Sequence, residues 1–83
     1  MIAQDKKRCN SLLATLSFAG QSVAAELRGE LETVHGIRCT LDRVCADLRR
    51  LNDLGAVRFD PESSVAQITL EGREHVQLLR ELF

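Results

Sequence analysis

The chain has 83 residues, enough for one small domain that buries roughly 60–65% of its surface on folding. Its 11 basic and 12 acidic side chains leave a net charge of −1, which excludes a protein that binds polyanions through a large overall positive charge. No uninterrupted apolar run exceeds four residues, so the sequence contains no candidate membrane-spanning helix.

The N-terminal segment and the cysteines bear on the compartment. Met1–Arg8 carries charged residues where a signal peptide would have an apolar segment, so we expect a cytoplasmic protein. Cys9, Cys39 and Cys45 are odd in number and lack the spacing of a disulfide framework or a zinc site. We therefore expect reduced thiols, with neither a metal nor another cofactor.

Apolar residues three and four positions apart predict a first helix from about Ala3 to Phe18. Its inward positions are Cys9, Leu12, Leu13 and Leu16. The basic cluster Lys6–Arg8 fits a solvated first turn, and contact with nucleic-acid phosphates is the alternative interpretation. Gly20 lies where this helix would end.

A second helix is predicted from Val23 to about Val34, with the Ser22 hydroxyl as its N-cap. Gly29 lies inside this helix, where it costs ~1 kcal/mol relative to alanine. Close approach of a neighbouring helix would explain that glycine, and so would a local weak point. The outer face of the helix is acidic, with Glu26, Glu30 and Glu32.

The segment that follows connects the second helix to the third. Gly36 fits the residue after a helix end, where a left-handed backbone is common. Ile37–Cys39 is long enough for a short extended strand. His35 lies close in sequence to Cys39 and Cys45, but a clustered metal-ligand motif is absent, so we interpret it as a residue at the end of the helix.

The third helix, from about 40 to 54, has the most regular pattern in the chain. Thr40 is its expected N-cap, and Gly55 is expected to end it with a left-handed backbone. One stripe is apolar, at positions 41, 44, 45, 48, 51 and 54. The opposite face is predicted to be free, and it carries Asp42, Arg43, Ala46, Asp47, Arg49, Arg50 and Asp53.

A hairpin and a last helix complete the predicted elements. Val57 and Phe59 alternate on one strand, and Ala66, Ile68 and Leu70 alternate on the next, with a turn at Asp60–Ser64 between them. Thr69 is the expected cap of a final helix from about 71 to 83. This helix has more apolar surface than one small core needs, which favours a dimer interface formed by Leu78, Leu82 and Phe83.

One stretch carries a specific resemblance. The sequence matches the run L-x-x-L-x-x-x-G-h-V…h-T-x-x-G-R, where h is an apolar residue, in two parts. The first part contains Leu48, Leu51, Gly55 and Val57, and the second is Ile68-Thr69-Leu70-Glu71-Gly72-Arg73. The chain thereby resembles the winged helix-turn-helix regulators of the broad ArsR, MarR and PadR-like type from bacteria and phages. The resemblance implies an α+β, mainly α fold in one domain over residues 1–83, with three helices, a two-stranded wing at about 56–70 and a C-terminal helix. Gly72 would let that helix start close to the sheet.

The resemblance also implies a function, namely a small dimeric regulator that represses transcription by occupying double-stranded DNA. The third helix would enter the major groove, with Arg43 as the first candidate for a guanine contact and Arg49 and Arg50 at phosphates. The positions carried over as DNA-facing are Arg38, Thr40, Asp42, Arg43, Ala46, Asp47, Arg49, Arg50 and, in the wing, Arg58. No catalytic constellation is evident, so we do not expect an enzyme.

The alternative is a winged helix used for protein contacts, such as an adaptor or a phage-type inhibitor of a host protein. The near-neutral charge and the acidic wing tip at Asp60 and Glu62 favour it. Ion pairs four residues apart on the third helix, Arg43 with Asp47 and Arg49 with Asp53, would also be expected of an ordinary solvated helix.

Overall fold

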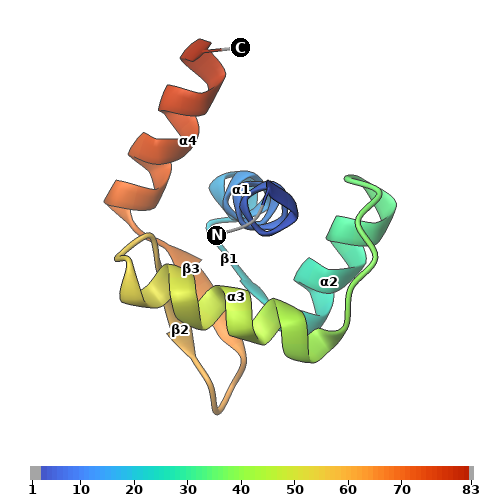
Figure 1. Ribbon diagram of the computed structural model, residues 1–83. Coiled ribbons are helices and arrows are strands. Elements are labelled where there is room, and N and C mark those ends of the chain that lie inside the picture. The colour runs from blue at the N-terminus through green and yellow to red at the C-terminus, as the bar shows by residue number, and fades with distance from the viewer. Residues whose placement is uncertain (1–2, 83) are drawn as a thin grey trace.

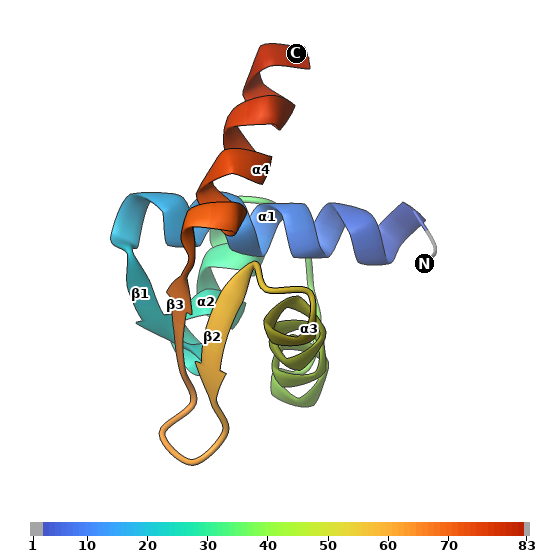
Figure 2. The same cartoon turned by 90° about the vertical axis from the view of Figure 1, so that its left-hand side faces the viewer.

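The computed structural model describes the backbone of residues 3–82 and the side chains of residues 4–78. Helix α1 lies across the middle of the molecule, with α2 and α3 on one side and α4 rising from the other (Figures 1 and 2). The elements in chain order are α1 (Ala3–Ala19), β1 (Gln21–Val23), α2 (Ala24–Thr33), α3 (Leu41–Asp53), β2 (Val57–Asp60), β3 (Val65–Ile68) and α4 (Leu70–Leu82). This mainly helical α+β architecture agrees with the predicted fold class.

The core forms where α1 meets the inner faces of α2, α3 and the sheet. Helices α1, α2 and α3 each contribute residues three and four positions apart, as the sequence pattern predicted, and the described part of α4 contributes Val76. The buried apolar side chains are Cys9, Leu12, Leu13, Leu16, Ala24, Leu27, Leu31, Val44, Leu48, Leu51, Val57, Ala66, Ile68 and Val76. Within the described part of the chain, no helix is long and apolar enough to cross a membrane.

The sheet has three antiparallel strands in the order β1-β3-β2, whereas the sequence predicted a two-stranded wing. The third strand is Gln21–Val23, which pairs with Val65–Gln67. The prediction of a strand at Ile37–Cys39 is wrong, because residues 36–40 have no regular secondary structure. Gly20, with φ +80°, turns the chain directly from α1 onto the edge of the hairpin.

Strand β1 also changes how α2 begins. Ser22 does not cap the helix: its Oγ donates to Glu26 Oε2 at 3.1 Å, and the N-cap residue is Val23. The backbone N–H of Ala24 donates instead to the carbonyl oxygen of Ser64, 2.9 Å away in the hairpin. The sheet therefore satisfies a helix N–H that the sequence assigned to a side-chain cap.

The start of α4 is fixed by Thr69 and Gly72. Thr69 Oγ1 accepts from the N–H of Gly72 at 3.1 Å and donates to the carbonyl oxygen of Gly55 at 2.6 Å, which confirms the predicted cap. A Cβ at Gly72 would lie 2.2 Å from the carbonyl oxygen of Ala56, so the predicted close approach is confirmed. Leu70, predicted to continue the face of the second strand that carries Ala66 and Ile68, instead begins α4 and is 70% exposed.

Gly29 has a different environment from Gly72. A Cβ added at Gly29 would meet no atom within 4 Å, so close approach of a neighbouring helix does not explain it. The space beside Gly29 opens onto the surface between α1 and α2.

Candidate nucleic-acid interface

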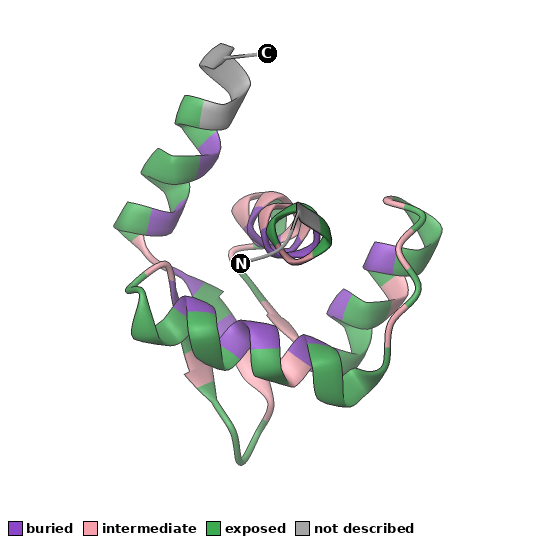
Figure 3. Cartoon of the chain, viewed as in Figure 1, coloured by how far each residue is buried: buried purple, intermediate pink, exposed green. Residues whose placement is uncertain are grey.

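Helix α3 buries one face and exposes the other (Figure 3). Val44, Leu48 and Leu51 are at most 4% exposed and hold the helix against the core. A period of 3.6 residues places the outermost stripe opposite them. This stripe consists of Asp42, Ala46, Arg49 and Asp53, and all four are exposed.

Both ends of α3 are formed as predicted. Thr40 Oγ1 accepts from the N–H of Arg43 at 3.1 Å, which confirms the N-cap. Gly55, with φ +82°, ends the helix. The apolar stripe does not stay buried to its ends, however, since Leu41 is 44% exposed and Leu54 is 69% exposed.

Asp47 does not lie on the exposed face of α3, so the prediction that placed it there among the DNA-facing residues is wrong. Asp47 is 5% exposed and forms a two-pronged ion pair with Arg8 of α1, through Nε to Oδ2 and through Nη2 to Oδ1 at 3.1 Å. Arg8 was expected in a solvated turn but is 9% exposed, and its Nη2 also donates to Asp5 at 2.5 Å. Hydrogen bonding to Asp47 is the main cause that raises the pKa of Arg8 above its ordinary value.

A signal for the burial of Asp47 was present in the sequence. Position 47 lies three residues after Val44 and four before Leu51, which is the spacing of the buried stripe. A carboxylate at such a position requires a cationic partner, because an unpaired buried charge is very costly. Arg8 is the partner that α1 supplies.

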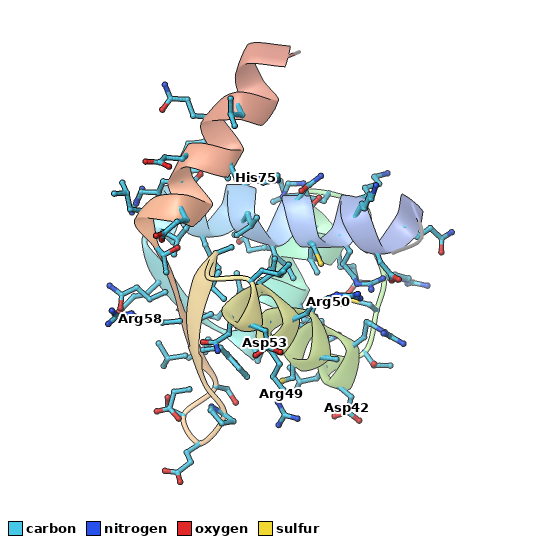
Figure 4. The ribbon with its side chains drawn as sticks, turned by 60° about the vertical axis from the view of Figure 1, so that its left-hand side comes forward. Asp42, Arg49, Arg50, Asp53, Arg58 and His75 are labelled. Atoms are coloured by element: carbon cyan, nitrogen blue, oxygen red, sulfur yellow. The ribbon has the colours of Figure 1, made fainter. Side chains whose placement is uncertain are left out.

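Three arginines of α3 remain exposed: Arg43, Arg49 and Arg50. Within the described part of the chain, their side chains form no hydrogen bond or ion pair, and neither of the predicted pairs with Asp47 and Asp53 is present. Figure 4 shows Arg49 directed away from the body of the molecule and Arg50 on the side that faces α1. These guanidinium groups are therefore available to an external partner.

Arg38 lies just before α3 and is exposed. Its Nε donates to Glu32 Oε1 at 3.3 Å, and the two side chains are 88% and 45% exposed. A pair so open to water contributes little to stability. An anionic ligand could therefore replace Glu32 at low cost.

The wing does not place Arg58 beside the α3 arginines. Val57 and Phe59 face the core, so Arg58 points from the opposite face of the sheet, away from α3 (Figure 4). The exposed turn between β2 and β3 is acidic, with Asp60 and Glu62. The N–H of Glu62 donates to Asp60 Oδ1 at 3.0 Å and, together with Ser63, lowers the pKa of Asp60.

The predicted dimer residues are described only in part. Leu78 is 58% exposed on α4, whereas the side chains of Leu82 and Phe83 lie outside the described residues. Beside α4, a groove of about 480 Å³ is lined by residues of α1, the end of α3 and the start of α4, including the exposed Leu54. Figures 1 and 2 show α4 extending away from the rest of the chain.

The cysteine and histidine side chains differ in burial and in their contacts. Cys9 is buried, Cys39 and Cys45 are partly buried, and burial raises the pKa of both Cys9 and Cys39. His35 Nε2 lies 3.2 Å from Thr15 Oγ1. Among the described residues, no group of three or more His, Cys, Asp or Glu side chains could hold a metal ion.

Comparisons with known proteins concern the fold. No family model matches the chain, and no curated protein matches it. Among solved structures, the chain is similar to F93 from STIV, described as a winged-helix DNA-binding protein, with a TM-score of 0.74. The match covers 100% of this chain and 90% of that chain at 18% sequence identity. The predicted winged-helix fold is thereby confirmed.

Proposed function

We propose that this chain is a small transcriptional regulator that binds double-stranded DNA through α3, in the manner of the ArsR, MarR and PadR-like winged-helix proteins. The observation that carries the proposal is the exposed face of α3, with Arg43, Arg49 and Arg50 unpaired in the described structure. The description of F93 from STIV as a DNA-binding protein of the same fold supports it. The proposal assigns the protein no catalytic role and is consistent with a cytoplasmic location.

Arg49 takes the central role in this proposal. It lies on the outermost stripe of α3, where a side chain reaches furthest into a major groove, and a bidentate contact with guanine would contribute ~1–3 kcal/mol of base discrimination. Arg43 and Arg50 lie seven residues apart on the flank of the helix and suit phosphate contacts. This revises the expectation from sequence, in which Arg43 was the candidate for the base contact.

The buried Asp47 removes one negative charge from the surface that would meet DNA. The exposed side chains of α3 then include three arginines and two aspartates, Asp42 and Asp53. Aspartate can itself accept a hydrogen bond from the amino group of cytosine, so a mixed outer stripe can read a sequence as well as bind a backbone.

We further propose that the protein acts as a homodimer that represses by operator occupancy. Leu54, which lines the groove next to α4, and Leu78 of α4 leave apolar surface exposed, and covering such surface favours association. A dimer would present two copies of α3 to half-sites about one DNA turn apart, roughly 34 Å.

A protein partner is the second candidate, and one observation favours it. The wing tip exposes Asp60 and Glu62, and hydrogen bonds keep Asp60 in its charged form. A negative tip would repel DNA phosphates but could contact a basic protein surface. In that case α3 would contribute little to binding.

Substitution of Arg49 separates the two candidates. DNA fragments selected from a random pool by the native protein would be titrated with Arg49→Ala, and Arg28→Ala on α2 would serve as the matched control for loss of one exposed arginine. The regulator should lose about 1–3 kcal/mol of preference for its selected site in Arg49→Ala and keep that preference in Arg28→Ala. Equal behaviour of the two variants would contradict the proposal.

A further inference from the structure

A second groove lies on the surface between α1 and α2, away from the exposed stripe of α3. Its volume is about 700 Å³, within the range of roughly 300–1,000 Å³ that small-molecule sites occupy. Small residues make the space: Ala14 and Ala19 line it from α1, and Gly29 lines it from α2. No atom lies within 4 Å of where a Cβ on Gly29 would be, so the missing side chain deepens the groove.

The charged residues that line the groove favour a positively charged ligand. Glu26 and Glu30, one turn apart on α2, both line the groove, and the lining contains neither lysine nor arginine. Ser22 Oγ donates to one oxygen of the Glu26 carboxylate at 3.1 Å and leaves the other available. Among the residues that line the groove, a cation would meet two carboxylates, and the one basic side chain is His35, whose Nε2 lies 3.2 Å from Thr15 Oγ1.

Apolar surface around the carboxylates selects a ligand with an apolar body. Phe18 is 84% exposed and Val34 is 66% exposed, and both line the groove. Apolar side chains beside two carboxylates favour an organic cation, because such a ligand combines positive charge with apolar groups. Anions and strongly hydrated metal ions fit this combination poorly.

We propose that the α1–α2 groove binds a small lipophilic cation, of the quaternary ammonium or phosphonium class. Glu26 and Glu30 hold the charge, Phe18 and Val34 contact the apolar groups, and Gly29 leaves the room they need. Leu27 and Leu31 on the other face of α2 are fully buried next to α3, so a ligand that displaced α2 would act on the packing of α3. That link to DNA binding rests on the proposed function, whereas binding of the cation does not.

The test is calorimetric titration of the full chain, without DNA, with tetraphenylphosphonium and with tetraphenylborate, which has the same shape and the opposite charge. We expect saturable binding of one phosphonium ion per chain and much weaker binding of the borate. The double variant Glu26→Gln/Glu30→Gln should weaken phosphonium binding by about tenfold or more, because two carboxylates are lost. Glu32→Gln, on the same helix but outside the groove, should leave it unchanged.

Substitutions at Gly29 test whether phosphonium binding needs the open space in the groove. Gly29→Leu would fill the groove from a position with open space and replaces glycine by a good helix former, so the variant should fold and lose phosphonium binding. Gly29→Ala should fold and retain it. Absence of phosphonium binding to the native chain, equal binding of the borate, or full binding by Gly29→Leu would each overturn the proposal. None of these outcomes depends on whether the protein binds DNA.

Discussion

At the scale of single residues, the pair between Arg8 and Asp47 links α1 to the helix proposed to enter DNA. Both side chains are at most 10% exposed, and the carboxylate is held by two donors of one guanidinium group. Such a planar, two-point contact fixes geometry better than a single charge contact does. The pair therefore positions α3 on α1 as well as neutralising Asp47.

Removing one partner of this pair should be costly. We expect Asp47→Asn to lower the free energy of unfolding by about 3 kcal/mol, because Arg8 would keep a buried charge with reduced compensation. Urea unfolding followed by circular dichroism measures the change. Asp53→Asn on the exposed stripe of the same helix is the matched control and should have little effect.

The double variant Arg8→Met/Asp47→Leu distinguishes a paired charge from simple loss of packing. It leaves no lone buried charge, so it should be more stable than Asp47→Asn. A double variant less stable than the single one would contradict this interpretation of the pair.

The two helical glycines Gly72 and Gly29 should respond oppositely to alanine. Gly72→Ala places a methyl group 2.2 Å from a backbone oxygen, so we expect a loss of about 2–3 kcal/mol in the free energy of unfolding. Gly29→Ala meets open space and should gain about 1 kcal/mol from helix propensity. Thermal unfolding of both variants measures the difference, and a stable Gly72→Ala protein would refute the close approach of α4 to Ala56.

At the scale of elements, the sequence predicted the features that depend on interactions between residues close together in the chain. The Thr40 and Thr69 caps, the turn at Gly55 and the buried stripe of α3 follow from side chains within a few residues of one another. Strand β1 could not be found this way, because Gln21–Val23 becomes a strand only through pairing with Val65–Gln67, more than 40 residues later. Asp47 is an intermediate case: its spacing from Val44 and Leu51 indicated a buried position, but its partner Arg8 lies on another helix.

The candidate site was predictable to the same extent. The exposed positions Arg43, Arg49 and Arg50 follow from the helical period, and the structure places them on the surface. The direction of Arg58 depends on which face of the sheet packs on the helices. That choice is made by tertiary packing, so the sequence could place Arg58 in the wing but not relative to α3.

The wing tip offers a test at this scale. Glu62→Lys should strengthen DNA binding and steepen its salt dependence by about one phosphate contact, because it replaces repulsion by attraction beside α3. Glu74→Lys changes charge equally but on α4, which points away from α3 and the wing (Figure 1). Fluorescence anisotropy with labelled duplex DNA compares them. Equal effects of both variants would show that the wing has no special place in binding.

At the scale of the whole molecule, α4 packs mainly on α1 through its described residues and extends away from the rest of the chain (Figures 1 and 2). Val76 is buried against α1, His75 Nε2 lies 3.3 Å from Asn10 Oδ1, and Leu78 beyond them is 58% exposed. A helix that leaves apolar surface exposed next to a groove suits contact with a second copy. The dimer proposal depends on this geometry.

Leu78→Asp should convert the proposed dimer to a monomer, because a carboxylate would be buried without a partner at the interface. Sedimentation equilibrium measures the mass against the 9.3 kDa of one chain. Leu70→Asp is the control, at a leucine that is 70% exposed at the start of α4. A mass that Leu78→Asp leaves unchanged would refute the proposed interface.

The central claim is that α3 binds duplex DNA with sequence preference. Its most direct test is fluorescence anisotropy of the native protein with labelled fragments selected from a random pool and with a scrambled duplex, at two salt concentrations. We expect tighter binding to the selected fragment and an affinity that falls steeply with salt, because arginines of α3 would displace counterions from phosphates. Absence of binding even at low salt would refute DNA binding through α3 and favour a protein partner.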